Sequence, residues 1–221
     1  MKVKLISCSQ AVELPEYIKT PQELVAYCAR VSNPANQLNT ETSEKLIRYL
    51  VKHQHWSPLE MVSACLEIET TRDIARQILR HRSFSFQEFS QRYADPVKDL
   101  DFEYRDCRLQ DLNNRQNSIE GADSDLQYAW YVAQRELIEK ARETYKWAID
   151  NGIAKEVARA VLPEGLTMSR MYMNGTLRSW IHYIQLRSAN GTQKEHMEIA
   201  LACAKAIAKI FPLTKELTTE A

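Results

Sequence analysis

The residue types best suited to chemistry gather in one stretch, from Arg80 to Arg92. Three arginines and a histidine stand there among serines, phenylalanines and a single glutamate. A guanidinium stays charged at any working pH and offers five donors in one plane, which suits phosphate oxygens and the carbonyl edges of heterocycles. The stretch therefore predicts a site for an anionic, carbonyl-rich ligand. A plainer interpretation is a helix C-terminus, where the dipole favours cations, followed by a solvated loop.

The composition limits how such a ligand can be held. The 29 basic residues balance the 29 acidic ones, so no net field recruits a nucleic-acid polymer or an anionic membrane. Only five isolated glycines occur, which excludes both a dinucleotide-binding glycine motif and a P-loop. Side chains, above all arginines, must then hold any phosphate.

The cysteines and the N-terminus indicate the compartment. Five scattered cysteines with no CxxC pair favour a reducing compartment and argue against both a disulfide framework and a zinc site. His53 and His55 have no third ligand at metal spacing, so no metal is expected. The first apolar run is too short for a signal peptide, and no span approaches membrane length. We therefore expect a cytoplasmic protein.

The hydrophobic spacing predicts the elements that would position these residues. We expect one α+β domain over 1–221, with a small, mostly antiparallel sheet packed against several helices, including one long central helix. Strands are expected over 2–8, 62–69 and 166–174, with a further candidate over 101–111. A polar loop over 112–123 is of the kind that often covers a site. Helices are expected over 21–32, 41–53, 70–81, 124–150, 154–162, 176–189 and 192–211.

Three of these elements carry specific expectations. Thr70 would cap the 70–81 helix, with Asp73 at N3, and would thus place the start of the basic stretch on a rigid helix end. The three phenylalanines 84, 86 and 89 are expected in the core rather than as a stacking surface. The inward stripe of the 124–150 helix is predicted to be Leu126, Trp130, Ala133, Leu137, Ala141, Thr144 and Ala148.

The spacing of the basic stretch resembles a known signature. Arg80-His81-Arg82 followed by Ser85, Ser90 and Arg92 is similar to the motif of the flavin-dependent thymidylate synthases, and the similarity extends from His55 to Glu195. Further anchors are Arg159-Ala160-Val161-Leu162-Pro163 and Leu186-Arg187.

The resemblance implies an activity. The protein would be a methyltransferase that converts dUMP to dTMP, with methylenetetrahydrofolate as carbon donor and FAD, reduced by NADPH, as hydride carrier. No cysteine lies in the motif, which agrees with a mechanism that lacks a thiol nucleophile. Family members form homotetramers whose active sites draw on several subunits, so the resemblance implies the same assembly here.

The resemblance also implies roles for individual residues. Arg187 would face the uracil, where a permanent cation favours loss of the imide proton, and His55 and Ser90 would take part in catalysis. The implied dUMP contacts are Gln77, Ile78, Leu79, Arg80, Glu88, Phe89, Ser90, Gln91, Arg92, Arg159 and Arg187. The implied FAD contacts are Ser57, Arg80, His81, Arg82, Glu88, Thr176, Leu177, Arg178 and His182.

Some features depart from the family or allow another interpretation. Thr176 and His182 stand where many members have Asn, and Gly191 where they have His, which weakens the assignments at the flavin rim. Arg187 could instead be a surface cation paired with Glu195.

Two other functional classes also stay open. One is a protein that binds RNA or single-stranded nucleic acid and stacks the bases on the phenylalanines. The zero net charge argues against this class. The other is a scaffold whose basic cluster only pairs with acidic neighbours.

Overall fold

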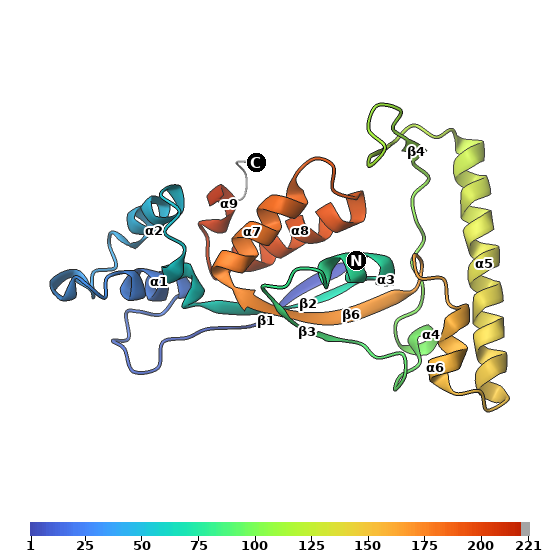
Figure 1. The fold of residues 1–221 in the computed structure, drawn as a ribbon, viewed down its shortest axis with the longest axis horizontal. Helices are drawn as coiled ribbons and strands as arrows, with labels where there is room; N and C mark the ends of the chain where they lie inside the picture. The colour runs from blue at the N-terminus through green and yellow to red at the C-terminus, as the bar shows by residue number, and fades with distance from the viewer. Residues whose placement is uncertain (218–221) are drawn as a thin grey trace.

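A four-stranded antiparallel sheet forms the middle of the molecule in the computed structural model, which describes residues 1–217 (Figure 1). The strand order is β1 (Lys2–Cys8), β2 (Ser63–Thr71), β6 (Met168–Thr176) and β3 (Ser85–Glu88). Each neighbouring pair is antiparallel. This sheet, together with the helices around it, confirms the predicted α+β class.

The helices lie over one face of the sheet and at its two ends (Figure 1). Over the sheet lie α3 (Arg72–Ile78), α7 (Leu177–Ser188) and α8 (Lys194–Ile207), with the short α9 (Thr214–Leu217) after them. One end carries α1 (Pro21–Ala29), α2 (Ser43–Lys52) and the turns η1 (Pro34–Asn36) and η2 (Ser57–Glu60). The other end carries α4 (Pro96–Asp99), α5 (Ser124–Asp150), α6 (Lys155–Ala158), the turn η3 (Arg159–Val161) and the hairpin β4 (Leu109–Gln110) and β5 (Ser118–Ile119).

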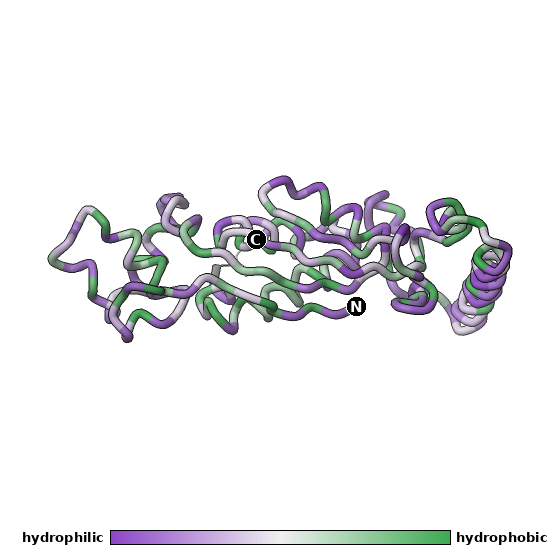
Figure 2. The backbone as a smooth tube through the Cα atoms, turned by 90° about the horizontal axis from the view of Figure 1, so that it is seen from below, coloured by the Kyte–Doolittle hydropathy of each residue, from purple (hydrophilic) through white to green (hydrophobic). Residues whose placement is uncertain are grey.

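The core lies between the sheet and helices α7 and α8. Alternate residues of a strand point to the same face, so Leu66 and Ile68 of β2 are fully buried beside Met171 and Met173 of β6. Trp180 of α7 covers them, and its Nε1 donates to the Ala64 carbonyl at 3.0 Å. Figure 2 shows the same pattern as apolar colouring along the central strands. This core holds α3 and α7 rigidly over β2 and β6.

The long helix has the predicted bounds, but it is not central. Helix α5 stands at one end of the molecule, beside α6 and away from the sheet (Figure 1). Leu126, Trp130, Ala133 and Leu137 of the predicted stripe are exposed, whereas Ala141 and Ala148 are buried. The full set of buried α5 residues is Gln134, Ile138, Ala141, Tyr145 and Ala148. The predicted central position and inward stripe were wrong, although the bounds were right. The helical period shows which face of a helix is apolar, but it does not show whether other residues of the same chain pack against that face.

Several other boundaries also differ from the predictions. Thr70 is still part of β2 and buried, so Thr71 is the N-cap of α3. The Thr71 hydroxyl donates to Asp73 at 2.6 Å and caps no backbone N–H. The 101–111 segment is not one strand: it forms a bridge from Phe102 to Thr167 and then β4. The 112–123 segment is not only a loop, because it returns as β5. The 154–162 helix is divided into α6 and η3.

Candidate functional site

The basic stretch folds in three parts. Helix α3 ends at Ile78, a turn carries Arg80 to Ser83, and β3 begins at Ser85. Between them Phe84 is only 9% exposed and packs edge-on to Trp180, with ring centroids 4.8 Å apart. Phe84 is therefore an anchor in the core, as predicted, and cannot serve as a stacking surface for bases.

Arg187 forms its clearest contact with a histidine of the basic stretch. Its Nε donates to His81 Nε2 at 2.9 Å. Because a guanidinium can only donate, His81 Nε2 must carry a lone pair, so the ring is neutral with its proton on Nδ1. Burial, with the charges of Arg187 and Arg80, lowers the pKa of His81 to about 4. The imidazole therefore leaves the charge of Arg187 unneutralised.

Glu195 is not the partner of Arg187. It accepts instead from Arg108, at 2.6 Å, and lies 3.4 Å from Arg105. The alternative in which Arg187 is a cation paired with Glu195 is thus wrong for this structure.

Gln77 lies on α3, in the turn before His81. Its amide is hydrogen bonded to Gln193 and His196. The side chains of the next two residues are not placed to contact a ligand, because Ile78 is fully buried and Leu79 packs against the same core. Any contact that these two make with a ligand must come from the backbone.

A second group gathers where β3 ends. Glu88 accepts from Ser169 at 2.8 Å and lies 3.7 Å from Arg72. The backbone N–H of Phe89 donates to the Arg170 carbonyl at 2.8 Å. Neither Ser169 nor Arg72 was predicted, because the pairings of β3 and of β2 with β6, which bring them to Glu88, are not readable from spacing.

The turn after β3 carries the rest of this group. Ser90 Oγ accepts from the Arg92 backbone N–H at 3.3 Å, and the Arg92 side chain pairs with Glu156 at 3.2 Å. Gln91 is buried, and its Nε2 has no hydrogen-bond partner among residues 1–217. Arg159 stands at the start of η3, directly after α6, which carries Glu156. The second group thus presents cations, a hydroxyl and an unpaired amide.

A third group lies at the opposite end of the sheet. Arg178 pairs with Glu60 of η2, and the rings of Trp56 and His182 meet edge to face at 4.5 Å. Ser57 is exposed at the start of η2. No sequence pattern indicates that Glu60 contacts Arg178 or that Trp56 contacts His182.

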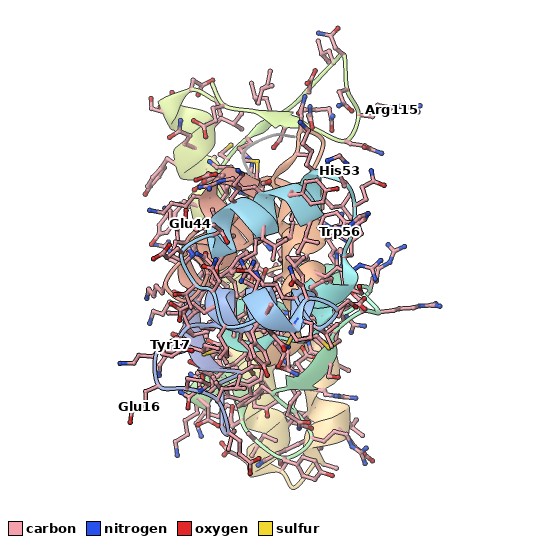
Figure 3. All side chains as sticks on the ribbon, turned by 90° about the vertical axis from the view of Figure 1, so that its left-hand side faces the viewer. Glu16, Tyr17, Glu44, His53, Trp56 and Arg115 are labelled. Carbon is pink, nitrogen blue, oxygen red and sulfur yellow. The ribbon has the colours of Figure 1, made fainter. Side chains whose placement is uncertain are left out.

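Two other expected flavin residues at this end, Thr176 and Leu177, contribute to the fold through their side chains. The Thr176 hydroxyl accepts from the Ser179 backbone and caps α7, and the Leu177 side chain is fully buried. His55 is exposed near His53, with their rings 6.3 Å apart. Figure 3 shows His53 and Trp56 along the same edge of this end of the molecule.

The structure does not join the three groups. Glu88 lies opposite Met171, and Arg178 follows Thr176 at the far end of β6. Those five steps along β6 span roughly 17 Å. No hydrogen bond or ion pair within residues 1–217 links the Arg187–His81–Gln77 group, the Glu88–Arg92 and Arg159 group, and the Ser57–Arg178–His182 group.

Four of the arginines predicted for the site have no carboxylate partner within residues 1–217, unlike several other arginines of the chain. Arg72, Arg76, Arg105 and Arg108 are ion-paired. By contrast, no ion pair among the described residues involves Arg80, Arg82, Arg159 or Arg187. Unpaired guanidiniums close to fixed hydrogen-bonding groups are well suited to bind an external anion.

Two further findings concern residues 1–217. No group of three or more His, Cys, Asp or Glu side chains gathers there as a metal centre would require. None of the helices in this part of the chain is long and apolar enough to cross a bilayer.

Comparison with known proteins gives consistent matches along the chain. The model of the family described as thymidylate synthase complementing protein matches residues 13–213. A probable flavin-dependent thymidylate synthase of Paramecium bursaria Chlorella virus 1 is 48% identical over 212 residues, which are 96% of each chain. A flavin-dependent thymidylate synthase of Synechocystis sp. is 50% identical over 193 residues, 87% of each chain.

A solved structure matches as well. It is a UMP/dUMP methylase, PolB from Streptomyces cacaoi, bound with 5-Br dUMP. The TM-score is 0.79 at 27% identity, over 99% of this chain and 94% of that one.

Proposed function

Because the chain belongs to the flavin-dependent thymidylate synthase family, we propose that it converts dUMP to dTMP with methylenetetrahydrofolate as the carbon donor. It is a methyltransferase and a flavoprotein. The observation that carries the proposal is Arg187, held by neutral His81 and without a carboxylate partner among the described residues. A guanidinium in that state can meet the imide edge of a uracil with its two terminal nitrogens.

The residues present fit FAD. The exposed guanidiniums of Arg80 and Arg82 have no carboxylate partner within residues 1–217 and suit a diphosphate. Arg178, His182 and Ser57 supply a cation, a ring and a hydroxyl at the other end of the sheet. We assign the flavin to these residues, together with the backbone at Thr176 and Leu177. Bound FAD, reduced by NADPH, would supply the hydride.

The remaining predicted residues would bind and orient dUMP. Arg92 and Arg159 would hold the phosphate, since two charge-assisted contacts of about 1.5 to 3 kcal/mol each replace a glycine loop. Gln77, Glu88 and Ser90 would complete the pocket with an amide, a carboxylate and a hydroxyl. Arg187 would stabilise negative charge on the uracil as the imide proton is lost, because a permanent cation lowers the pKa of a neighbouring acid.

We further propose that no cysteine acts as a nucleophile. Burial raises the pKa of the Cys28, Cys65 and Cys203 thiols, and a thiol must ionise to attack. A variant with serine at positions 8, 28, 65 and 107 and alanine at the buried position 203 should still form dTMP. Complete loss of dTMP formation, with FAD and dUMP still bound, would contradict this.

We also propose a homotetramer whose active sites draw on several subunits. Two observations support it. The exposed face of α5 carries Leu137 and Trp147, 52% and 60% exposed, which is apolar area that a second chain could cover. In addition, no hydrogen bond or ion pair within residues 1–217 links the three groups of site residues.

A spectrum and a titration test the proposed function. The purified protein should take up FAD and show flavin absorbance. Addition of dUMP should change that spectrum, because the stretch from Gln77 to Arg92 carries proposed contacts of both ligands. A protein that takes up no FAD and does not respond to dUMP would overturn the proposal.

A further inference from the structure

A chain of hydrogen bonds starts at a buried carboxylate behind the Arg187 group. Glu195 is 5% exposed and accepts from Arg108. Burial acts to raise the pKa of Glu195, but the hydrogen bond from Arg108 and the charge of Arg105 outweigh it, so the net pKa is lowered. Glu195 is therefore a carboxylate, which can only accept hydrogen bonds.

The Glu195 carboxylate sets the orientation of the side-chain amides of Gln193 and Gln77. Gln193 Nε2 donates to Glu195 Oε2 at 3.0 Å, so the Gln193 oxygen faces away from the carboxylate. That oxygen accepts from Gln77 Nε2 at 2.8 Å. The orientation of the Gln77 amide, ambiguous from its shape alone, is thus set by the charge of Glu195.

The far side of Gln77 is held by a buried histidine. Gln77 Oε1 lies 3.1 Å from Nδ1 of His196, a side chain with 0% exposure. Since the amide oxygen only accepts, Nδ1 must carry the proton and Nε2 the lone pair. Nε2 therefore accepts from the Tyr183 hydroxyl at 3.2 Å.

This chain also reaches Arg187. The Tyr183 ring packs edge-on against His81, with centroids 4.9 Å apart, and His81 accepts from Arg187. Helices α3, α7 and α8 are thus cross-linked by polar side chains directly behind Gln77 and Arg187.

We propose that Glu195, Gln193 and His196 form a positioning relay that holds the Gln77 amide with one N–H and one oxygen lone pair turned toward the substrate. The inference rests on the proposed function, because it takes Gln77 as a contact of dUMP. His196 and Gln193 are positioning residues and do not touch the substrate themselves. Without the relay, the amide can reverse and present an acceptor where the substrate needs a donor.

Binding of dUMP to the FAD-loaded protein tests the relay. His196→Phe removes both hydrogen bonds and should weaken dUMP binding about tenfold, the equivalent of one lost hydrogen bond. His196→Asn keeps an N–H near the Nδ1 position and should restore most of the affinity. Gln193→Ala, on a partly exposed residue, gives a second variant that should fold if His196→Phe does not. Ile207→Val, in the core part of α8, is the control for loosened packing and should bind as the wild type does.

A double-mutant cycle separates positioning from general destabilisation. If His196 acts through Gln77, the tenfold effect of His196→Phe should fall below about twofold in a Gln77→Ala background. Equal effects in both backgrounds, or unchanged binding in His196→Phe and Gln193→Ala, would overturn the relay while the proposed function stands. A wild-type protein that binds no dUMP would overturn the proposed function, and the relay with it.

Discussion

Arg187 differs from the ion-paired arginines of residues 1–217 because a neutral imidazole, not a carboxylate, accepts its Nε–H. Its charge is therefore available to a ligand. The planar fork of the guanidinium matters as much as the charge, since Nε is held by His81 while the two terminal nitrogens have no carboxylate partner within residues 1–217.

Arg187→Lys should lower the rate of dTMP formation by at least about 100-fold while FAD stays bound. A lysine keeps the charge but lacks the planar fork in which one nitrogen bonds His81 while two others are free to meet a uracil edge, and losing one preorganised donor costs that much. The rate and the flavin spectrum are measured on the same sample. Arg115→Lys is the matched control, because Arg115 projects from the β4–β5 hairpin (Figure 3). Unchanged turnover in Arg187→Lys would show that Arg187 does not face the uracil.

Buried His196 and half-buried His81 should make stability depend on pH. The folded-state pKa is lowered to about 4 for His81 and about 3 for His196, in both cases mainly by burial. The unfolded chain then binds protons that the folded chain does not between about pH 6.5 and pH 4, so stability is lost as the pH falls through that window.

His196→Asn removes one of these titrating groups. Between pH 7 and pH 5 it should lose less free energy of unfolding than the wild type, by on the order of 1 kcal/mol. Urea unfolding at both pH values measures the difference. An identical loss in the two proteins would mean that His196 is protonated in the folded state.

At the scale of elements, the turn between α3 and β3 depends on Gly175 of β6, which has no Cβ. A Cβ on Gly175 would lie 2.3 Å from Cδ1 of Phe84, which packs on Trp180. Gly175→Ala must therefore push Phe84 out of its place in the core and move the turn that carries Arg80 to Ser83.

Gly175→Ala should lower the free energy of unfolding by about 1 to 3 kcal/mol, the usual cost of overpacking a core. Gly165→Ala is the control, because a Cβ there has nothing within 4 Å. Urea unfolding compares the two variants. Equal stability would mean that Phe84 is not fixed over Gly175.

The elements could be predicted from sequence where the pattern is local. The strand over 2–8 and the helix over 124–150 have the predicted bounds because period and capping residues act within a few residues. The candidate strand over 101–111 failed because an extended segment needs a partner, and it bridges to Thr167 only at Phe102.

The same limit applies to the site. Motif spacing pointed to Arg80, Arg187 and their neighbours, but the partners that tune them come from distant segments. Arg187 bonds His81 across 106 residues, and His196 reaches Gln77 across 119. Such pairings follow from how α3, α7 and α8 pack, which no local pattern reports.

At the scale of the whole molecule, the site residues form separate groups. Helix α6, with η3 directly after it, lies at the end of the molecule beside α5, whereas α7 and α8 lie over the sheet (Figure 1). In the proposed tetramer, of four times the chain mass of 25.6 kDa, one chain would bring Arg159 to the Arg187 of another.

Mixed oligomers test whether Arg159 and Arg187 of one active site come from different chains. Arg159→Ala and Arg187→Lys should each be nearly inactive alone, since each removes one group from every site. Chains of both kinds, coexpressed with different tags and purified together, should regain dTMP formation, because some sites then combine an intact Arg159 with an intact Arg187. No recovery in a mixed oligomer of confirmed composition would mean that one chain supplies both arginines.

The formation of dTMP by the purified protein tests the proposed activity most directly. The protein is supplied with FAD, NADPH, methylenetetrahydrofolate and dUMP, and the nucleotide products are identified by mass spectrometry. We predict dTMP, with a mass increase over dUMP that comes from the folate carbon, and none when FAD is omitted from flavin-free protein. No dTMP from flavin-loaded, folded protein with all four components present would contradict the proposed function.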